Sequence, residues 1–298
     1  MRFRDTKPIA TYGIRFLDKF LVSINEGELV LIGANSGCGK STLAQHIAKV
    51  NSKNGVKTAL FSLENSQGDT MRREIYRNYK DLSGDWKMSF REFNKMVYDD
   101  SINEELFDRA EKIAKEDLGN IWLYEKPADG FTVEDLKRQF DKAVNEDGCS
   151  LVIIDHLDYF DQLQNEKDEN KYLREIMKAI RKLMEGVGGG KKAPVIAFSQ
   201  FRKPTDQKMI IPTQYEFYGS SDKSKIATTV ITIAKNYEGQ SHEMDRNLIH
   251  TFIAIRKDRF GRQKVADCLF NLLNESYTDV FTLGTTDEWG HYFKEDEC

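Results

Sequence analysis

The feature that most constrains this chain is a glycine-rich run from Gly33 to Thr42. It follows the apolar segment 28–32 and precedes a helical pattern. A loop between a strand and a helix suits phosphate binding, because glycines let backbone N–H groups turn inward and the helix N-terminus adds positive charge. We therefore predict a nucleotide-binding loop made of Ala34, Asn35, Ser36, Gly37, Cys38, Gly39, Lys40, Ser41 and Thr42.

Two side chains of this loop have distinct expected roles. Lys40 reaches the β- and γ-phosphates, and Ser41 ligates Mg²⁺. The loop departs from the strict pattern in one respect, because the first glycine position is occupied by Ala34 and Gly33 lies one residue early. An ordinary glycine-rich turn is the alternative, and the flanking strand and helix disfavour it.

Strand-like runs alternate with helical patterns up to residue 198. Apolar strands are expected at 57–63, 120–124, 151–154 and 193–198, and helices at 41–50, 133–144 and 171–184. The charged stretch 69–117 is also expected to be helical, with Trp86 and Phe90 as packing points. This order predicts an α/β fold with a mostly parallel twisted sheet flanked by helices. Antiparallel strands are expected near the C-terminus at 226–234, 248–255 and 264–270.

Composition narrows the class of protein. The chain has 298 residues, of which 40% are hydrophobic and 31% are charged, and its net charge is −4. We expect one domain over 1–298 with its core at about 11–274. The four scattered cysteines indicate a reducing compartment, and no apolar run is long enough to span a bilayer, so a cytoplasmic protein is expected. The charge gives no sign of a nucleic-acid partner, although a few basic loops can act locally.

Three polar side chains end other predicted strands. Asp155 follows the apolar strand 151–154, where a carboxylate holds Mg²⁺ in such folds, and a turn or capping aspartate is the alternative. Glu64 ends the next strand after the glycine-rich loop, where it can polarise an attacking water, or it is a solvated surface residue. Gln200 can sense the γ-phosphate, or it is an ordinary polar residue at a strand end.

A basic cluster at 255–261 contains Lys257 and Arg259 on a predicted hairpin. Arg259 can act as an arginine finger that presents positive charge to a neighbouring subunit's nucleotide. A solvated turn is the alternative, and position alone favours it.

Taken together, these segments resemble the ATPase domain of the DnaB-like replicative helicases, including the phage primase-helicases. The matching pieces follow in order: Ser62–Glu64, Leu151–Asp158, Pro194–Gln200, Gly219–Ser221 and Lys257–Gly261. The resemblance implies a RecA-like core, a homo-oligomeric ring that is usually hexameric, and ATP or another NTP bound with Mg²⁺ between subunits. It gives nucleotide and Mg²⁺ roles to Lys40, Ser41 and Asp155, the general-base role to Glu64, the sensor role to Gln200, and roles across the interface to Lys257 and Arg259.

The resemblance also implies loops that grip single-stranded DNA, here at about 160–171 and 201–218. The second loop carries the candidate DNA-binding cations Arg202, Lys203 and Lys208, and a solvated loop is the alternative. The family's replicative members carry an N-terminal primase or primase-binding domain, whereas only residues 1–10 precede the expected core here. A separate primase or loader protein is therefore an expected partner.

Three functions remain open from the sequence. The first is an ATP-dependent helicase or translocase that moves on single-stranded DNA in replication. The second is a RecA-like nucleotide-gated binding protein of recombination or annealing, or an ATP switch, without unwinding activity. The third is a degenerate ATPase retained as a ring subunit, which the intact Lys40, Ser41, Glu64 and Asp155 disfavour.

Overall fold

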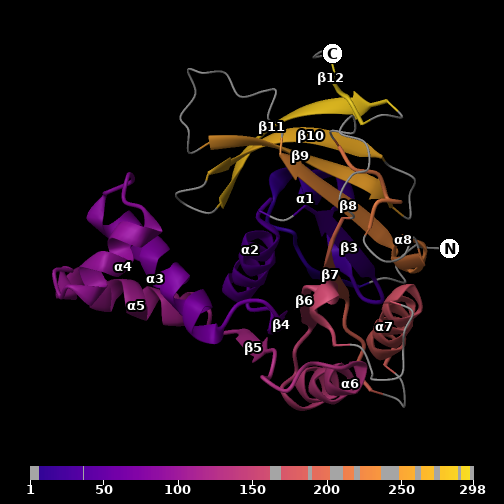
Figure 1. Ribbon diagram of the computed structural model, residues 1–298, viewed down its shortest axis with the longest axis horizontal. Coiled ribbons are helices and arrows are strands. Elements are labelled where there is room, and N and C mark those ends of the chain that lie inside the picture. The colour runs from indigo at the N-terminus through magenta and orange to yellow at the C-terminus, as the bar shows by residue number, and fades with distance from the viewer. Residues whose placement is uncertain are drawn as a thin grey trace.

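The computed structural model describes residues 7–35, 37–161, 169–186, 190–201, 211–217, 222–235, 248–258, 263–271, 276–287 and 290–295. Ten strands form one sheet in the order β12-β11-β10-β9-β8-β3-β7-β6-β4-β5 (Figure 1). Its strands are β3 (Leu29–Ala34), β4 (Thr58–Ser62), β5 (Ile121–Glu125), β6 (Leu151–Asp155), β7 (Val195–Gln200), β8 (Thr229–Lys235), β9 (Leu248–Lys257), β10 (Lys264–Asn271), β11 (Ser276–Thr286) and β12 (Tyr292–Lys294).

The pairing directions divide this sheet into two parts. Strands β8, β3, β7, β6, β4 and β5 are parallel, and β9 to β12 continue from β8 as antiparallel strands. Both parts were expected, so the predicted α/β fold with antiparallel strands near the C-terminus is confirmed. The sheet also extends past residue 274 through β11 and β12.

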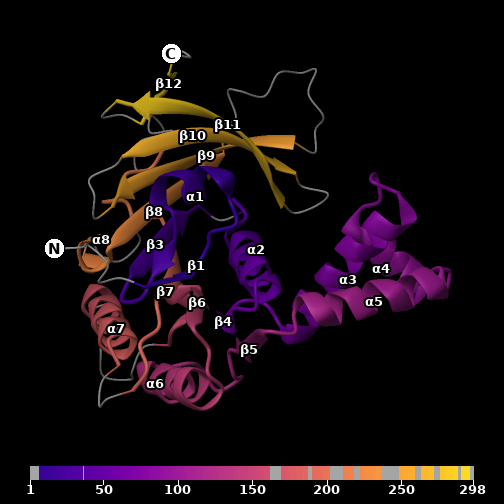
Figure 2. The same ribbon diagram turned by 180° about the vertical axis from the view of Figure 1, so that it is seen from behind.

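Helices cover both faces of the parallel part. Successive residues of β3 alternate between two cores, because side chains on a strand point to opposite faces: Leu29 and Leu31 face one core, Val30 and Ile32 the other. The first core packs against α6 (Val133–Asp141) and α7 (Glu169–Met184), and the second against α1 (Arg15–Leu21) and α2 (Lys40–Lys53) (Figures 1 and 2). The remaining short elements are β1 (Pro8–Ala10), β2 (Ile24–Asn25), the π-helix η1 (Lys142–Glu146), the 3-10 helix η2 (Leu157–Tyr159) and α8 (Asp222–Ile226).

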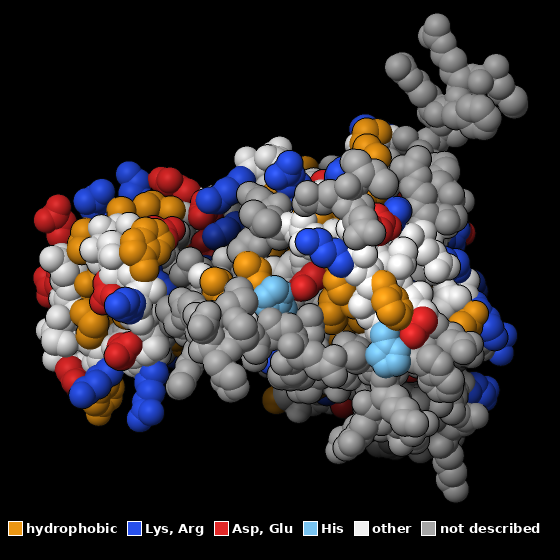
Figure 3. Space-filling view, turned by 90° about the horizontal axis from the view of Figure 1, so that it is seen from above, with side chains coloured by type: hydrophobic (Ala, Val, Ile, Leu, Met, Phe, Trp, Pro, Cys, Tyr) orange, Lys and Arg blue, Asp and Glu red, His pale blue; other side chains and the backbone are white. Residues whose placement is uncertain are grey.

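A lobe of three helices projects from the sheet between β4 and β5 (Figures 1 and 2). It comprises α3 (Gln67–Ser83), α4 (Phe90–Tyr98) and α5 (Glu104–Asp117), which begin at side-chain caps from Ser66, Ser89 and Asn103. Phe90 packs on the lobe's own small core as expected, but Trp86 is 54% exposed, so its predicted packing role is wrong. Side chains of both charge signs cover the lobe, at the left of Figure 3.

None of the helices in the described ranges combines the length and the apolar character needed to cross a bilayer.

Candidate functional site

The candidate nucleotide site lies at the carboxyl ends of four neighbouring parallel strands, where open α/β sheets bind their ligands. Strand β3 leads into the glycine-rich loop, β4 into Glu64, β6 ends at Asp155 and β7 ends at Gln200. The register places these ends together, because Ala34 pairs with Gln200 and Ser62 pairs with Asp155. A cavity of about 320 Å³ opens there, lined by Gly37, Gly39, Lys40, Ser41, Thr42, Gln45, Glu64, Asn65, Arg73, Gln200 and Phe270.

The glycine-rich loop depends on two glycines for its backbone shape. Gly37 and Gly39 have φ angles of +75° and +81°, a region that other residues rarely adopt. Gly39 is the N-cap of α2 and supplies no side chain to its first turn, so the helix N-terminus is available to an anion. The predicted loop residue Ser36 lies outside the described residues.

Gly33 serves packing instead of phosphate binding. It lies inside β3, and a Cβ atom there would come within 2.4 Å of the Phe201 ring and 2.5 Å of the Phe217 ring. These two rings meet edge to face at 5.1 Å, and the backbones of Phe201 and Phe217 form an antiparallel bridge. The early glycine in the sequence pattern is therefore explained by the two rings that lie against β3.

Lys40 is buried at the floor of the cavity. Its ammonium donates to the carbonyl oxygens of Ala34 and Asn35, each at a distance of 3.4 Å. Burial lowers the pKa of Lys40, and the nearby charges of Asp155 and Glu64 counter that effect. These long contacts leave the ammonium close to the loop, where a bound phosphate would gain a strong charge-assisted partner.

Asp155 and Ser41 form the candidate magnesium site. The Ser41 hydroxyl hydrogen-bonds to the Asp155 carboxylate, whose pKa is raised by burial and by the charge of Glu64. Within the described structure, Oδ1 of Asp155 is buried and has no hydrogen-bond partner. An orphaned carboxylate oxygen beside a hydroxyl suits a hard cation that takes few protein ligands and several phosphate or water oxygens. The described residues contain no denser group of three or more His, Cys, Asp or Glu.

Glu64 lies at the open side of the cavity. Its side chain is 42% exposed, so water reaches the carboxylate. The Tyr159 hydroxyl hydrogen-bonds to it, and burial together with the Glu64 charge raises the pKa of Tyr159. Nε2 of His156 lies 3.8 Å from Oε2 of Glu64. A solvated carboxylate held by a neighbouring hydroxyl is suited to orient an attacking water.

Gln200 faces the same histidine. Its side-chain Nε2 lies 3.2 Å from Nε2 of His156, and its backbone N–H donates to Oδ2 of Asp158 at 2.7 Å. The structure therefore brings together all four residues named from the sequence at these strand ends: Lys40, Glu64, Asp155 and Gln200.

Sequence reasoning missed three residues that line the cavity. Arg73 comes from the first turns of α3 and places its guanidinium 4.8 Å from the Phe90 ring centre. Phe270 reaches the cavity from β10, and Gln45 from α2. No local pattern marks any of them, because α3 and β10 reach the glycine-rich loop only through the strand order of the whole sheet.

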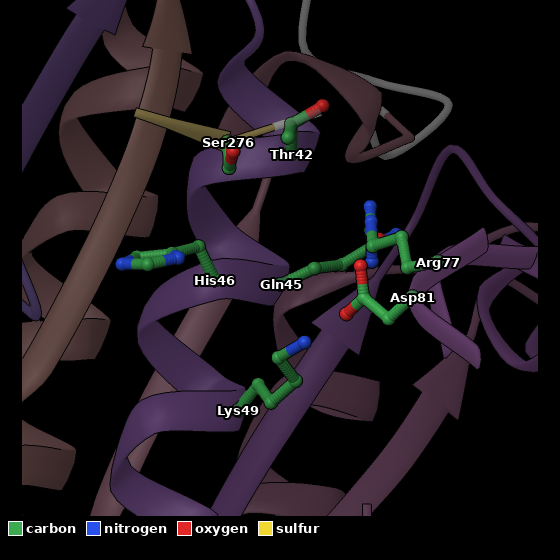
Figure 4. A pocket seen from close by; sticks show the side chains of 7 residues that line it. All are labelled: Thr42, Gln45, His46, Lys49, Arg77, Asp81 and Ser276. Atoms are coloured by element: carbon green, nitrogen blue, oxygen red, sulfur yellow. The ribbon is translucent and has the colours of Figure 1, made fainter. Parts of the chain in front are cut away.

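A second cavity of about 190 Å³ adjoins the first, with Thr42 and Gln45 lining both. In Figure 4, side chains of α2 face those of Arg77 and Asp81 on α3, with Ser276 of β11 at one end. Glu74 binds two cations of this region, Lys49 at 2.7 Å and Arg77 at 2.9 Å. These ion pairs fasten α3 to the helix that carries Lys40.

Lys257 lies away from the cavity and contacts its own chain. Its ammonium donates to the carbonyl oxygens of Ser224, Lys225 and Ala227, at 2.9, 3.1 and 2.6 Å. A lysine has three N–H donors, so this arrangement uses all of them on the C-terminal end of α8. The expectation that Lys257 reaches a neighbouring subunit thus meets a competing role within the chain. The candidate finger Arg259 and the candidate DNA-binding residues Arg202, Lys203 and Lys208 lie outside the described residues.

Comparison with solved structures shows the fold in other proteins. One structure, described as the ATPase domain of another protein, superposes with a TM-score of 0.74 at 18% identity, covering 91% of each chain. A DnaB-like replicative helicase, solved in a study of its interactions with primase, gives 0.72 at 19% identity, over 91% of this chain and 62% of that one. A KaiC-like protein from the archaeon Pyrococcus horikoshii gives 0.55 at 16% identity, over 93% and 99%.

Comparison with curated protein sequences gave no match. The model of the DnaB-like helicase C terminal domain, by contrast, matches residues 10–279. That span contains the cavity, the four strand ends and the described strands of the sheet up to β10. The resemblance inferred from the sequence is thereby confirmed, and the chain belongs to the DnaB-like helicase C-terminal domain family, a family of P-loop NTPases that includes replicative helicases.

Proposed function

We propose that this chain is an ATP-driven motor that moves along single-stranded DNA during replication. One observation carries the proposal: Lys40, Glu64, Asp155 and Gln200 follow or end adjacent parallel strands around one cavity. A carboxylate open to water opposite a buried lysine is the arrangement that hydrolysis of a phosphoanhydride requires.

In this mechanism Glu64 accepts hydrogen bonds from the attacking water and orients it in line with the γ-phosphate. Lys40 neutralises charge on the β- and γ-phosphates, and the N-terminus of α2 adds backbone donors. Gln200 contacts the γ-phosphate from the opposite strand end. Mg²⁺, held through Ser41 and Asp155, would supply further charge neutralisation between the phosphates.

Arg259 of a neighbouring subunit completes the site in this proposal. The transition state gathers negative charge on the γ-phosphate oxygens, and an arginine supplied from outside the cavity stabilises it. A hexameric ring that places each Arg259 at the next subunit's cavity satisfies this requirement. A separate primase or loader is the proposed further partner.

The segment that follows β7 is the proposed DNA contact, through Arg202, Lys203 and Lys208. Two features of the described residues support a connection between this segment and the nucleotide. Gln200 lies in the cavity and directly precedes the segment. Phe201 and Phe217 pack against Gly33 on the strand that leads into the glycine-rich loop.

The decisive experiment measures ATP hydrolysis with and without single-stranded DNA, with Lys40→Ala as the blank. Several-fold stimulation by DNA, together with strand separation on a forked substrate, supports the motor. Turnover that is indifferent to DNA contradicts it and favours a nucleotide-gated switch. Absence of magnesium-dependent turnover above the Lys40→Ala blank refutes the enzymatic assignment itself.

A further inference from the structure

A chain of buried polar side chains extends from Glu64 away from the phosphate side of the cavity. His156 is 2% exposed and lies between Glu64, Gln200 and Asp158. Asp158 is 2.9 Å from the ammonium of Lys223, which is completely buried. Ser199 bridges this pair, because its hydroxyl lies 2.8 Å from the Lys223 ammonium and 3.3 Å from both Asp158 oxygens. None of these groups has a role in the mechanism described so far, except Glu64 and Gln200.

The geometry fixes the tautomer of His156. Nδ1 lies 3.2 Å from Oδ2 of Asp158, and a carboxylate requires a donor at that distance. A proton on Nδ1 leaves Nε2 of the neutral ring as an acceptor, and this atom faces the side-chain nitrogen of Gln200 at 3.2 Å. Asp158 therefore orients the Gln200 side chain through the histidine, and Gln200 and His156 together border Glu64.

Asp158 also joins the two ends of the segment proposed to contact DNA. At one end the Gln200 backbone N–H donates to Oδ2, and at the other the Lys223 ammonium donates to Oδ1. Lys223 belongs to α8, whose C-terminal carbonyl oxygens are held by Lys257. One carboxylate thus connects residues 200 and 223, on either side of that segment, to the histidine beside Glu64.

The charge state of Asp158 fits this arrangement. Burial alone would raise the pKa of Asp158, but the hydrogen bond to His156 and the charge of Lys223 lower it below its ordinary value. A buried lysine and a buried carboxylate each cost several kcal/mol of desolvation, and such pairs often add nothing to stability. A functional requirement explains their presence in the interior better than stability does.

We propose that the Asp158–Lys223 ion pair is a positioning device that holds His156 and Gln200 beside Glu64 and links hydrolysis to the DNA-contacting segment. The proposal rests on the proposed function, because Glu64 must be the group that prepares the water. Asp158 and Lys223 touch no nucleotide atom in this scheme, so they act through His156 and Gln200 alone.

The test compares Asp158→Asn with a matched control, Asp117→Asn. Asp117 forms an ion pair with Lys53 at the same distance of 2.9 Å, and its side chain is 10% exposed against 11% for Asp158, but it lies on α5 in the helical lobe. Nucleotide-binding sites are counted by titration with a fluorescent ADP analogue, and ATP turnover is expressed per titrated site. This normalisation removes the effect of misfolded protein, which a merely structural role would produce.

We expect Asp158→Asn to lower turnover per site by about 10- to 100-fold, within the range of a misplaced general base. The dissociation constant of the ADP analogue stays within about 2-fold, because Lys40 and the helix N-terminus are untouched. Stimulation by single-stranded DNA falls towards none. Asp117→Asn keeps wild-type turnover, nucleotide affinity and DNA stimulation.

Wild-type turnover and DNA stimulation per site in Asp158→Asn overturn the proposal. If that variant does not fold, the double variant Asp158→Asn with Lys223→Met decides, because it leaves no uncompensated buried charge, and the same reduced turnover is expected from it. Glu64→Gln, measured in parallel, separates the two hypotheses. If Glu64→Gln retains hydrolysis, the proposed mechanism itself fails; if it is inactive while Asp158→Asn is fully active, only the positioning role fails.

Discussion

Replacing Gly33 by alanine tests whether this residue exists for packing or for phosphate binding. The added Cβ would lie 2.4 Å from Cε1 of Phe201 and 2.5 Å from Cε1 of Phe217, closer than carbon atoms approach. Both rings are buried, at 7% and 0% exposure, so neither can turn into solvent. Forcing one methyl group into a filled site costs about 1 to 3 kcal/mol, which lowers the melting temperature by about 2 to 9 °C in a domain of this size.

Thermal unfolding followed by circular dichroism measures this loss. Gly68→Ala is the matched control, because the nearest atom to a Cβ there is 3.8 Å away, and it should not lower the melting temperature. Adding Phe201→Leu to Gly33→Ala removes the ring atoms that clash and should recover part of the loss. By contrast, Gly37→Ala meets no atom within 4 Å but strains a φ of +75°, so it should weaken nucleotide binding more than Gly33→Ala does.

A melting temperature for Gly33→Ala within about 1 °C of the wild type would refute the packing role. Losses of stability that simply add in the double variant would refute it as well, because a relieved clash must appear as coupling between the two positions.

Three further predictions follow from the site. Asp155→Asn should weaken the magnesium dependence of ATP turnover by about 10-fold or more, about 1.4 kcal/mol, while nucleotide-free stability is kept or raised because a buried charge is removed; an unchanged magnesium titration would contradict the assignment. Glu74 keeps its charge in acid, because Lys49 and Arg77 outweigh burial and lower its pKa; its stabilisation is therefore present above its unfolded pKa and is lost as pH falls through the folded value. Glu74→Gln should cost about 3 kcal/mol at neutral pH and flatten the acid decline measured by urea unfolding, and an equally steep decline would contradict the ion-pair account. Arg259→Ala should abolish hydrolysis and leave nucleotide binding mostly intact. Mixing it with Lys40→Ala subunits should restore activity if the arginine acts across an interface, and no recovery in mixed rings would argue against that role.

The strand-end residues were predictable because their positions follow from local pattern alone. Glu64, Asp155 and Gln200 each end or follow an apolar run, and parallel strands bring their carboxyl ends to one edge of a sheet whatever their order. The glycine-rich loop is local in the same sense. These four pieces therefore give the phosphate side of the site without knowledge of the three-dimensional structure.

The rest of the site depends on contacts that no local pattern encodes. Arg73 lines the cavity because the helical lobe is inserted after β4, and Phe270 does so because β10 follows β9 across the antiparallel part of the sheet. Lys223 and Asp158 are 65 residues apart in sequence. Trp86 illustrates the opposite error, since an aromatic residue in a helical region suggested packing, yet the small core of the lobe closes without it.

The basic cluster around Lys257 shows how the structure separates residues that the sequence pattern groups together. Both Lys257 and Arg259 were candidates for reaching a neighbouring nucleotide, since charge and position alone do not distinguish them. Lys257 donates all three N–H groups to the carbonyl oxygens at the end of α8, where a cation satisfies groups that a helix leaves unpaired. Moving it to another subunit would expose those carbonyl oxygens and release the helix that carries Lys223. A role across the interface therefore costs less for Arg259, two residues later, and Lys257 is better understood as the residue that keeps α8, and through it Asp158, in place.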